Sequence, residues 1–361
     1  MDTDKSANKM ASGDAPVKSA RSLYLSMSPL VHIIATLVTT MVIGFIIYRA
    51  TQVENFRTND VGPQLLALSP QQLAQFGTSQ ADITVNLFVR NFPKFDVIKG
   101  EFIADMTVQF EFDARQISID RLKDFAFENA EILKKSEPQV QLAKDTVVVS
   151  YDVRVLFNTA FDYHNFPFDG HRFFMTLIPR GITPAEALFA ANREGFMLNK
   201  ALNTASWICV GRQVFVGYAQ EKLEKRGGSQ LALYPRVQFS LDFARDGMRH
   251  VLSLLVPMLL IFFVSLFSFT FDPLGFENSS IISISILSVT ALIGYRFVID
   301  NMSPQTGYFM ISDQLFLLFM FISCLVFFIN IFSARLNKYI KSAITCLLHL
   351  LIIGTIVYLT W

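Results

Sequence analysis

The stretch Phe166-Pro167-Phe168-Asp169 stands ahead of four closely spaced apolar segments, the first of which carries Pro257 in its interior. A proline between two aromatic residues makes a rigid turn, because its ring fixes the backbone φ angle. The sequence before this turn has alternating apolar and polar residues, whereas most of the sequence after residue 250 is apolar. This order predicts a β-rich domain whose turn lies against a bundle of membrane helices.

The composition places part of the chain in lipid. Of the 361 residues, 52% are hydrophobic and 17% are charged, whereas a soluble domain is roughly 45–50% apolar. The net charge of +1, without a cluster of Lys and Arg, argues against a nucleic-acid partner. Cys209, Cys324 and Cys346 lie far apart, so the sequence predicts neither a disulfide framework nor a metal site.

Five segments are long enough to cross a membrane. A hydrocarbon core about 30 Å thick requires roughly 20 apolar residues in a helix. The segments of this length are 30–48, 251–271, 281–299, 315–332 and 340–359. The first exceeds the usual apolar run of a secretory signal, about 7–15 residues, and no clear cleavage site follows it. We interpret it as an uncleaved anchor, with a removed signal peptide as the alternative.

Basic residues predict the orientation of these helices. Lys18 and Arg21 precede the first segment closely, and positively charged loops stay on the cytoplasmic side, so the amino terminus is predicted to be cytoplasmic. The middle domain is then external. The connection with Arg335, Lys338 and Lys341 falls inside, in agreement with the same rule, and the carboxyl terminus is external.

Alternating side chains predict half-buried strands between residues 81 and 243. The clearest runs are 83–89, 106–112, 147–155 and 237–243. Gly227 and Gly228 supply the turn of a hairpin whose second arm leads directly into the membrane. An antiparallel β-sandwich is the simplest architecture for such strands.

The predicted fold is therefore an external antiparallel β-sandwich, a four-helix transmembrane bundle and one additional amino-terminal transmembrane helix. Residues 49–80 are polar, with weak helical character around Pro70 to Phe76, and are predicted to be a tether. The predicted parts are a cytoplasmic tail (1–29), an anchor (30–48), the tether (49–80), the sandwich (81–247) and the helical bundle (248–361).

Residues 162–171, with the sequence DYHNFPFDGH, carry a resemblance to a known family. They resemble the signature loop of the pentameric ligand-gated ion channels, or Cys-loop receptors, in which three residues separate an Asp from an FPFD core. His171 stands where that family usually has Gln. Thr159 and Phe173 stand where animal members carry paired cysteines, so the chain is similar to the prokaryotic branch.

The resemblance extends to the helical part of the chain. Arg245 precedes the first helix of the bundle, Pro257 lies inside it, and the stretch 304–314 is similar to the linker between the family's second and third helices. The leading helix departs from the family's usual plan. The residues that the resemblance assigns to gating and coupling are Phe166, Pro167, Phe168, Asp169, Arg245, Pro257 and Pro304.

The resemblance implies a homopentamer in a bacterial inner (plasma) membrane, with a ligand-binding-like sandwich in the periplasm or outside the cell. The four-helix part would be the pore domain, and the FPFD loop would lie against the linker between its second and third helices, beside Arg245. The implied partners are membrane lipid and permeant ions.

The segment 281–299 would line the pore. It carries Ser283, Ser285, Ser288 and Thr290, and such hydroxyls either line a water-filled path or pack helices together. Two faces are possible, and the length of the preceding turn favours the first of them. That face is Ser283, Leu287, Thr290, Gly294 and Phe297, and the other is Ile281, Ser285, Ser288, Leu292 and Tyr295. On the favoured face, Leu287 and Phe297 would form apolar rings that gate the pore by dewetting.

Glu277 precedes this helix at its cytoplasmic end, and no Lys or Arg accompanies it between Asp272 and Tyr295. Fivefold repetition would make a ring of carboxylates that attracts cations, so monovalent cations are the expected permeant ions. The alternative is an acidic residue that stabilises the positive end of the helix dipole.

The ligand remains open, because a small molecule and a proton are equally compatible with the sequence. Agonists in the resembling family lie between adjacent sandwiches against aromatic side chains. The aromatic candidates here are Phe125, Phe127, Trp207, Tyr218 and Tyr234. The tip of the hairpin, residues 221–226, is charged instead of aromatic, which argues against an amine-binding site.

Two other classes of protein compete with the channel. An enzyme is disfavoured because the five His show no metal spacing and the sequence offers no nucleophile motif, phosphate loop or cofactor site. A non-conducting, membrane-anchored periplasmic binding or assembly module is the alternative. The channel interpretation is preferred because it explains the hydroxyl-bearing helix together with the FPFD loop.

Overall fold

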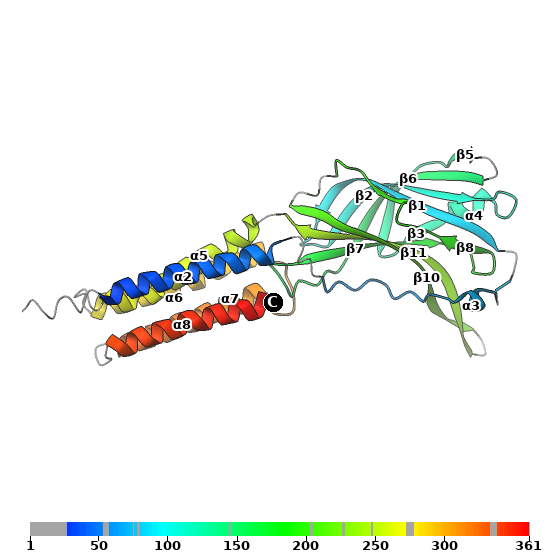
Figure 1. The fold of residues 1–361 in the computed structure, drawn as a ribbon. Helices are drawn as coiled ribbons and strands as arrows, with labels where there is room; N and C mark the ends of the chain where they lie inside the picture. Colours follow the sequence, from blue (N-terminus) through cyan, green and yellow to red (C-terminus); the bar gives the residue numbers. More distant parts are fainter. Residues whose placement is uncertain are drawn as a thin grey trace, which may run out of the picture.

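The computed structural model describes residues 27–52, 58–74, 76–77, 80–143, 146–202, 204, 206–225, 228–246, 248–271, 278–332 and 338–360. The molecule is elongated, with two β-sheets at one end and long helices at the other (Figure 1). The long helices are α2 (Met27–Ala50), α5 (Arg249–Phe271), α6 (Asn278–Met302), α7 (Ile311–Ile331) and α8 (Lys338–Thr360). The described part of residues 1–29 belongs to α2, and the rest of the predicted tail lies outside the described residues.

The larger sheet has the strand order β4-β6-β2-β1-β8, with β5 paired to β6 and β9 paired to β1. Its strands are β1 (Ala81–Asp96), β2 (Glu101–Phe112), β4 (Ala130–Lys135), β5 (Gln139–Ala143), β6 (Thr146–Asn158), β8 (Ala187–Ala190) and β9 (Phe196–Leu198). The smaller sheet has the order β10-β11-β7-β3. Its strands are β3 (Phe125–Phe127), β7 (Gly170–Pro179), β10 (Trp207–Lys225) and β11 (Gly228–Arg245).

Alternation along the strands builds the core of the sandwich. In β2 every second side chain is buried, from Phe102 to Phe112, while the intervening ones are half-buried. Aromatic rings from both sheets meet in the space between the sheets. The ring centroids of Phe102 (β2) and Phe173 (β7) are 4.7 Å apart, and those of Phe95 (β1) and Phe243 (β11) are 4.9 Å apart. The four predicted strands are therefore confirmed as parts of β1, β2, β6 and β11.

The pairing differs from the prediction at one edge of the sandwich. Most neighbouring strands are antiparallel, but β8 and β9 run parallel to β1. These strands are short, four and three residues, and each pairs with only a few positions of β1. Such brief pairings leave no periodic signal in the sequence, which explains why a purely antiparallel sandwich was predicted.

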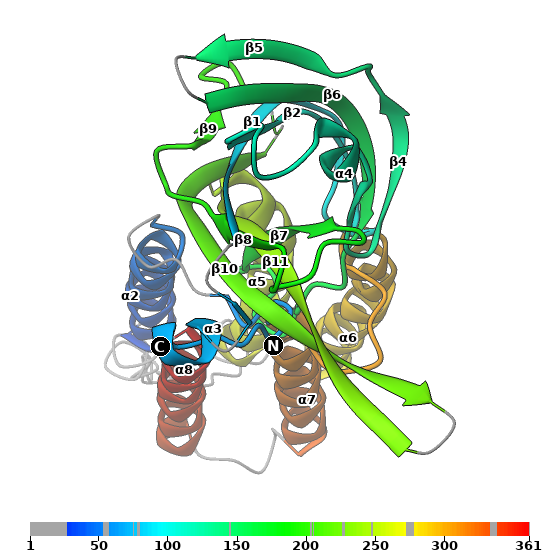
Figure 2. The same cartoon turned by 90° about the vertical axis from the view of Figure 1, so that its right-hand side faces the viewer.

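Five helices of the described chain are long and apolar enough to cross a membrane. They coincide with the five predicted segments and alternate in direction, so that the ends of α2 and α8 and the beginnings of α5 and α7 face the sandwich (Figure 1). Helix α6 packs against α5 and α7, and α2 packs against α8 and α5. Viewed from the sandwich end, α2 and α8 lie side by side, away from α6 (Figure 2).

The predicted tether is partly attached to the sandwich. It contains the short helix α3 (Pro70–Ala74), as expected, and Leu66 pairs with Tyr218 of β10 through two N–H···O bonds of 2.9 Å. A second short helix, α4 (Ile119–Lys123), precedes β3. The tether segment (residues 58–74) therefore runs from the membrane end of the sandwich to the β10–β11 hairpin.

A side chain of α6 replaces the hydrogen bond that Pro257 removes from α5. Proline lacks an N–H group, so it cannot donate to the carbonyl four residues earlier, which is that of Ser253. The hydroxyl of Tyr295 donates to this carbonyl at 2.8 Å and lies 3.2 Å from the carbonyl of Leu254. A neighbouring helix thus supplies a donor to a backbone group that proline leaves without one, which is how proline is tolerated in membrane helices.

We expect Tyr295→Phe to lower the free energy of unfolding by roughly 0.6–2 kcal/mol, the range for hydrogen bonds between membrane helices. The variant keeps the ring but removes the donor to the Ser253 carbonyl. Thermal denaturation of the solubilised protein measures the effect. Tyr358→Phe is the matched control, because that side chain is 83% exposed, and an equal shift in both variants would contradict this role of Tyr295.

Candidate functional site

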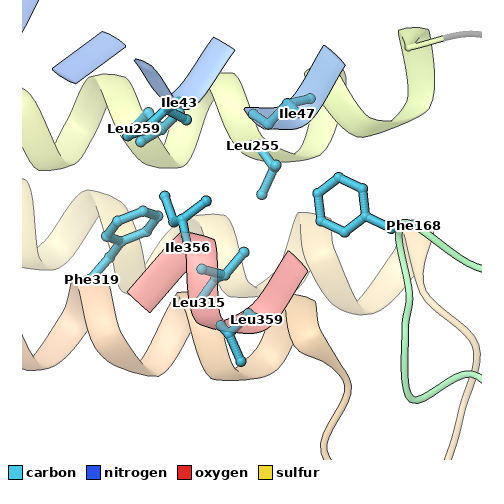
Figure 3. Close-up of a pocket in the computed structure, with 9 residues that line it drawn as sticks. All are labelled: Ile43, Ile47, Phe168, Leu255, Leu259, Leu315, Phe319, Ile356 and Leu359. Atoms are coloured by element: carbon cyan, nitrogen blue, oxygen red, sulfur yellow. The ribbon is translucent and has the colours of Figure 1, made fainter. Parts of the chain in front are cut away.

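The loop between β6 and β7, residues 159–169, is the junction loop, and it lies where the sandwich meets the helices. Phe166 and Pro167 are buried, and their peptide bond is cis. The ring of Phe168 points from the loop toward an apolar cavity between the helix ends (Figure 3). The other residues that line this cavity are Ile43, Ile47, Leu255, Leu259, Leu315, Phe319, Ile356 and Leu359. Four helices therefore surround one aromatic side chain of the loop.

The junction loop also caps α7. The N–H of Ile311 donates to the carbonyl of His164 at 3.0 Å, and the N–H of Ser312 donates to the carbonyl of Phe166 at 3.1 Å. The first N–H groups of a helix have no partner inside the helix, so the loop supplies acceptors that α7 itself cannot provide. A displacement of the loop would break these bonds or move the start of α7.

The linker between α6 and α7 contacts the same loop. The N–H of Tyr163 donates to the hydroxyl oxygen of Tyr308 at 2.9 Å, and the Tyr308 ring stacks on His164 with centroids 3.8 Å apart. In addition, Arg296 of α6 forms an ion pair with Asp313 in the first turn of α7, with Nη1 and Oδ1 2.5 Å apart. The end of α6, the linker and the start of α7 are thus held together next to the junction loop.

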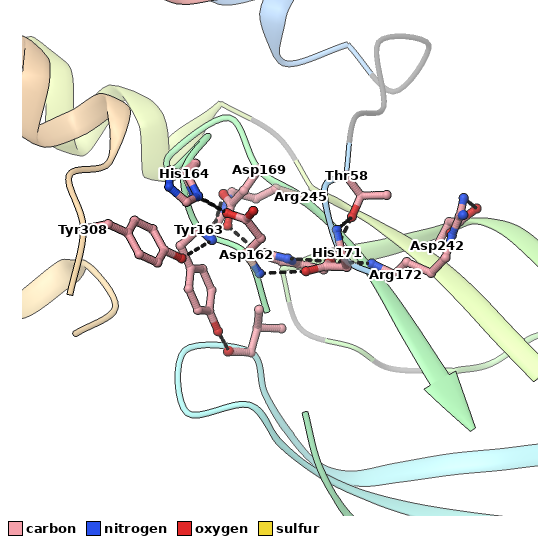
Figure 4. Close-up of polar contacts among 12 residues, drawn as sticks. Thr58, Asp162, Tyr163, His164, Asp169, His171, Arg172, Asp242, Arg245 and Tyr308 are labelled. Carbon is pink, nitrogen blue, oxygen red and sulfur yellow. Dashed lines mark hydrogen bonds and ion pairs between the residues drawn. The ribbon is translucent and has the colours of Figure 1, made fainter. Parts of the chain in front are cut away.

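Four charged side chains form the junction charge cluster: Asp60, Asp169, His171 and Arg245. Arg245 Nη2 lies 3.1 and 3.3 Å from the two carboxylate oxygens of Asp169 (Figure 4). His171 contacts Asp169 through Nε2 at 2.7 Å and Asp60 through Nδ1 at 3.1 Å. The side chains of Asp60, Asp169 and His171 are at most 3% exposed. Burial to this degree requires that the charges be paired.

Aromatic rings enclose the cluster. The Arg245 guanidinium carbon lies 4.4 Å from the centroid of Trp207 and 5.6 Å from that of Phe166. The ring of His171 is 4.5 Å from that of Phe161 and 5.1 Å from that of Tyr163. Arg245 Nε has no hydrogen-bond partner within the described residues, so this cation is held by Asp169 and by the faces of the rings.

Burial alone would raise the pKa of Asp169, but the charge of Arg245 and the hydrogen bond from His171 outweigh it and lower the pKa to about 2. Because the folded value lies below the unfolded one, the resulting stabilisation is present above pH ~4 and is lost as the pH falls through about 2. Burial alone would lower the pKa of His171, but its hydrogen bonds to Asp169 and Asp60 raise it. The carboxylate of Asp169 and the imidazolium form of His171 therefore stabilise each other.

Asp60 joins the tether segment to this cluster. One of its oxygens accepts the N–H of Asp162 at 2.7 Å, and the other accepts the N–H of Arg172 at 2.9 Å and the hydroxyl of Thr58 at 2.8 Å. No periodicity or motif in the polar segment 49–80 distinguishes this residue. The structure places Asp60, His171, Trp207 and Tyr308 at the same junction as Asp169 and Arg245, the residues for which the sequence predicted a coupling role.

Helix α6 has two distinct faces. The face that the sequence favoured, Ser283, Leu287, Thr290, Gly294 and Phe297, is exposed throughout. Of the alternative face, Ile281, Ser285, Ser288 and Leu292 are buried, and Tyr295 is half-buried and bonded to α5. Ser285 receives a 2.6 Å hydrogen bond from Asn330 of α7, which also donates to Ser268 of α5 at 2.7 Å. The alternative face thus serves packing inside one chain.

Two of the predicted ligand-binding residues require correction. Phe125 and Phe127 are 4% and 3% exposed, and they pack on Phe110 and Phe157 inside the sandwich. Since β3 turns these side chains inward, they cannot face a neighbouring sandwich. Trp207 is also buried, and its ring lies against the guanidinium of Arg245.

The structure places two of the other predicted site residues, Tyr218 and Pro304, in buried positions. Tyr218 is buried beside the tether segment, whereas Tyr234 of β11 is partly exposed and stays a prediction. Pro304 is buried near the beginning of the α6–α7 connection. Glu277 lies outside the described residues.

Comparison of the sequence with protein-family models and with curated proteins finds no match. The described residues also contain no group of three or more His, Cys, Asp or Glu side chains placed to hold a metal ion. Inferences about function therefore rest on the geometry of the junction and of α6.

We expect Asp169→Asn to lower the free energy of unfolding by about 3–5 kcal/mol, because it leaves Arg245 without its buried counter-charge and His171 with the carboxylate of Asp60 alone. Denaturation of the purified protein at pH 7 measures the loss. The acid-induced destabilisation of the wild type between pH ~4 and about 2 should also shrink in the variant.

Asp105→Asn is the matched control. Asp105 forms a bidentate pair with Arg154 across β2 and β6, but that arginine side chain is 49% exposed. An exposed pair contributes about 0–1 kcal/mol. A loss in Asp169→Asn no larger than in this control would mean that the junction charge cluster does not hold the loop.

Proposed function

We propose that the protein is a pentameric ligand-gated ion channel whose pore is lined by α6. The observation that carries the proposal is the exposed face of α6, which includes Ser283, Thr290 and Gly294 although the helix is long and apolar enough to span a membrane. Hydroxyl groups and backbone on such a face are suited to a water-filled path. A single chain cannot enclose a water-filled path, so this face could line a pore only in an assembly of several chains.

The proposed assembly is a homopentamer closed around the exposed faces of α6. One helix cannot enclose a pore, and cyclic repetition of one interface is the usual way to close a ring of identical subunits. The number five comes from the resemblance of residues 162–171 to the signature loop of the family. Native mass spectrometry of the solubilised protein should give five copies, and a stable monomer or tetramer would contradict this count.

The proposed coupling passes from the sandwich through the junction loop to α7 and α6. Three contacts of the loop support this route. Phe168 lines a cavity with four helices, two loop carbonyls accept hydrogen bonds from the start of α7, and His164 stacks on Tyr308. Movement of β7 and β11 in the sandwich would be transmitted by Asp169 and Arg245, which stand at the ends of the loop and of β11. Pro257 and Pro304 lie in the segments that would have to bend or shift.

Selectivity and location remain parts of the same proposal. A ring of Glu277 carboxylates at the cytoplasmic entrance would favour monovalent cations. The sandwich would lie in the periplasm or outside a bacterial inner membrane, with the amino terminus in the cytoplasm, as the positions of Lys18 and Arg21 suggest. The agonist is either a small molecule bound between sandwiches or a proton.

A non-conducting binding or assembly module is the competing function. It would use the same junction to hold the sandwich on the membrane, but it would leave the exposed hydroxyls of α6 without a role. The two functions differ in whether the purified protein carries current in a planar bilayer, and in whether α6 side chains control that current.

Cysteine substitution on the two faces of α6 tests the pore directly. Thr290→Cys, on the exposed face, should be modified by a charged thiol reagent during recording, and the current should fall by more than half. Ser288→Cys is the matched control, because Ser288 is only 3% exposed and faces the neighbouring helices. The native Cys209, Cys324 and Cys346 are first replaced by Ser or Ala.

Block of Ser288→Cys together with protection of Thr290→Cys would reverse the assignment of the faces. A protein that assembles but carries no current at any pH or with any ligand tried would favour the non-conducting module. The same recordings, made in a salt gradient, give the sign of the permeant ion through the reversal potential.

A further inference from the structure

We propose that Asp60 is a positioning residue that latches the chain following α2 onto the junction loop, and that the proton of His171 controls this latch. The leading helix would then be a second input to the loop, besides the sandwich. The role of such an input in gating rests on the proposed channel function, but the latch itself does not.

Asp60 holds the junction loop by both of its carboxylate oxygens. It accepts the N–H of Asp162 in the loop and the N–H of Arg172 at the start of β7, and it contacts the ring of His171 between them. Its side chain is 3% exposed, so these groups cannot be exchanged for water without separating the segments. The tether segment therefore supplies one wall of the junction charge cluster.

Helix α2 contacts the same loop on another side. Ile43 and Ile47, near the sandwich end of α2, line the cavity toward which Phe168 points. The tether segment, which follows α2 in the chain, is bound to the junction loop through Asp60. The junction loop is thus contacted by an apolar surface of α2 and by a carboxylate of the segment that follows it.

A buried polar contact fixes α2 among the other helices. The hydroxyl of Thr39 lies 2.9 Å from Nδ1 of His349 in α8, and both side chains are buried. The ring of His349 lies 6.1 Å from that of Phe263 in α5 and is nearly parallel to it. Helix α2 is therefore attached to the bundle at its middle and to the junction near its end.

The proton of His171 decides whether the latch is favourable. Each ring nitrogen faces a carboxylate oxygen, of Asp169 and of Asp60, and both can act as donors only in the imidazolium form. When His171 is protonated, the negative charges of the two carboxylates balance the positive charges of His171 and Arg245. Without this proton, the cluster has a net negative charge and one ring nitrogen turns a lone pair toward a carboxylate.

The surrounding groups reinforce this dependence. Arg172 is bound by Asp242 at 2.6 Å, so its guanidinium is not available to replace the lost charge, and Asp162 adds a further carboxylate nearby. The rings of Phe161, Tyr163 and Trp207 cover His171 and limit access of water. Since the carboxylates raise the pKa of His171, the latch is fully closed below the ordinary pKa of histidine and weakens as the pH rises through the raised value.

Hydrogen–deuterium exchange of the full-length protein in nanodiscs, followed by mass spectrometry between pH 6 and pH 10, tests the latch. Labelling times are scaled for the base-catalysed intrinsic rate. In the wild type, peptides with the amides of Asp162 and Arg172 should lose protection at alkaline pH by about tenfold, as expected for loss of a charge-assisted hydrogen bond. Asp60→Asn should show the weaker protection at every pH.

His171→Gln removes the titration, so its exchange should not vary with pH over this range. Asp105→Asn, in the exposed ion pair between β2 and β6, should follow the wild type. Protection in the wild type that is constant from pH 6 to pH 10, or Asp60→Asn with wild-type protection, would overturn the latch. The wild-type series needs no variant to fold, and the measurement needs no current, so absence of conduction would count against the channel and not against the latch.

Discussion

The buried carboxylate of Asp169 is the group on which the arrangement of the two halves depends. It stands at the end of the junction loop, fully removed from water, and its oxygens contact Arg245 at the end of β11 and His171 at the start of β7. Removing a charge from water costs several kcal/mol unless partners surround it. The loop, the two strands that lead to the membrane and the tether segment must therefore keep their relative positions for this carboxylate to remain paired.

The apolar contact of Phe168 complements this electrostatic one. Asp169 fixes the loop to the sandwich, whereas Phe168, the residue before it, points between helices α2, α5, α7 and α8. Because consecutive side chains serve opposite halves of the molecule, a small change of the loop backbone affects both. The backbone bonds from Ile311 and Ser312 add α7 to the same unit. The Phe-Pro-Phe-Asp stretch therefore joins the domains by packing, charge and helix capping together.

The sequence was sufficient to predict the helices, the principal strands and the junction loop, since each has a strong local signal: long apolar runs, alternation with period two, or an aromatic-proline turn. It was insufficient where a role depends on distant segments. Asp60 lies in a polar stretch without pattern, and only the fold brings it to His171. Phe125 and Phe127 were expected at a ligand site, but aromatic residues of a short strand pack inward or outward according to a register that the sequence does not reveal.

Helix α6 illustrates the same limit within a single element. Its hydroxyls were compatible both with a pore and with helix packing, and in each case the side chain bonds to its own helix: Ser283, Ser285, Ser288 and Thr290 all donate to the carbonyl four residues earlier, at 2.7–3.1 Å. Hydrogen bonding therefore does not separate the two roles, but burial does. Ser285 and Ser288 face the neighbouring helices, whereas Ser283 and Thr290 are exposed. An exposed hydroxyl that is already bonded within its own helix adds little cost in lipid, so the proposed contact of this face with water rests on the hydroxyls together with the exposed backbone at Gly294.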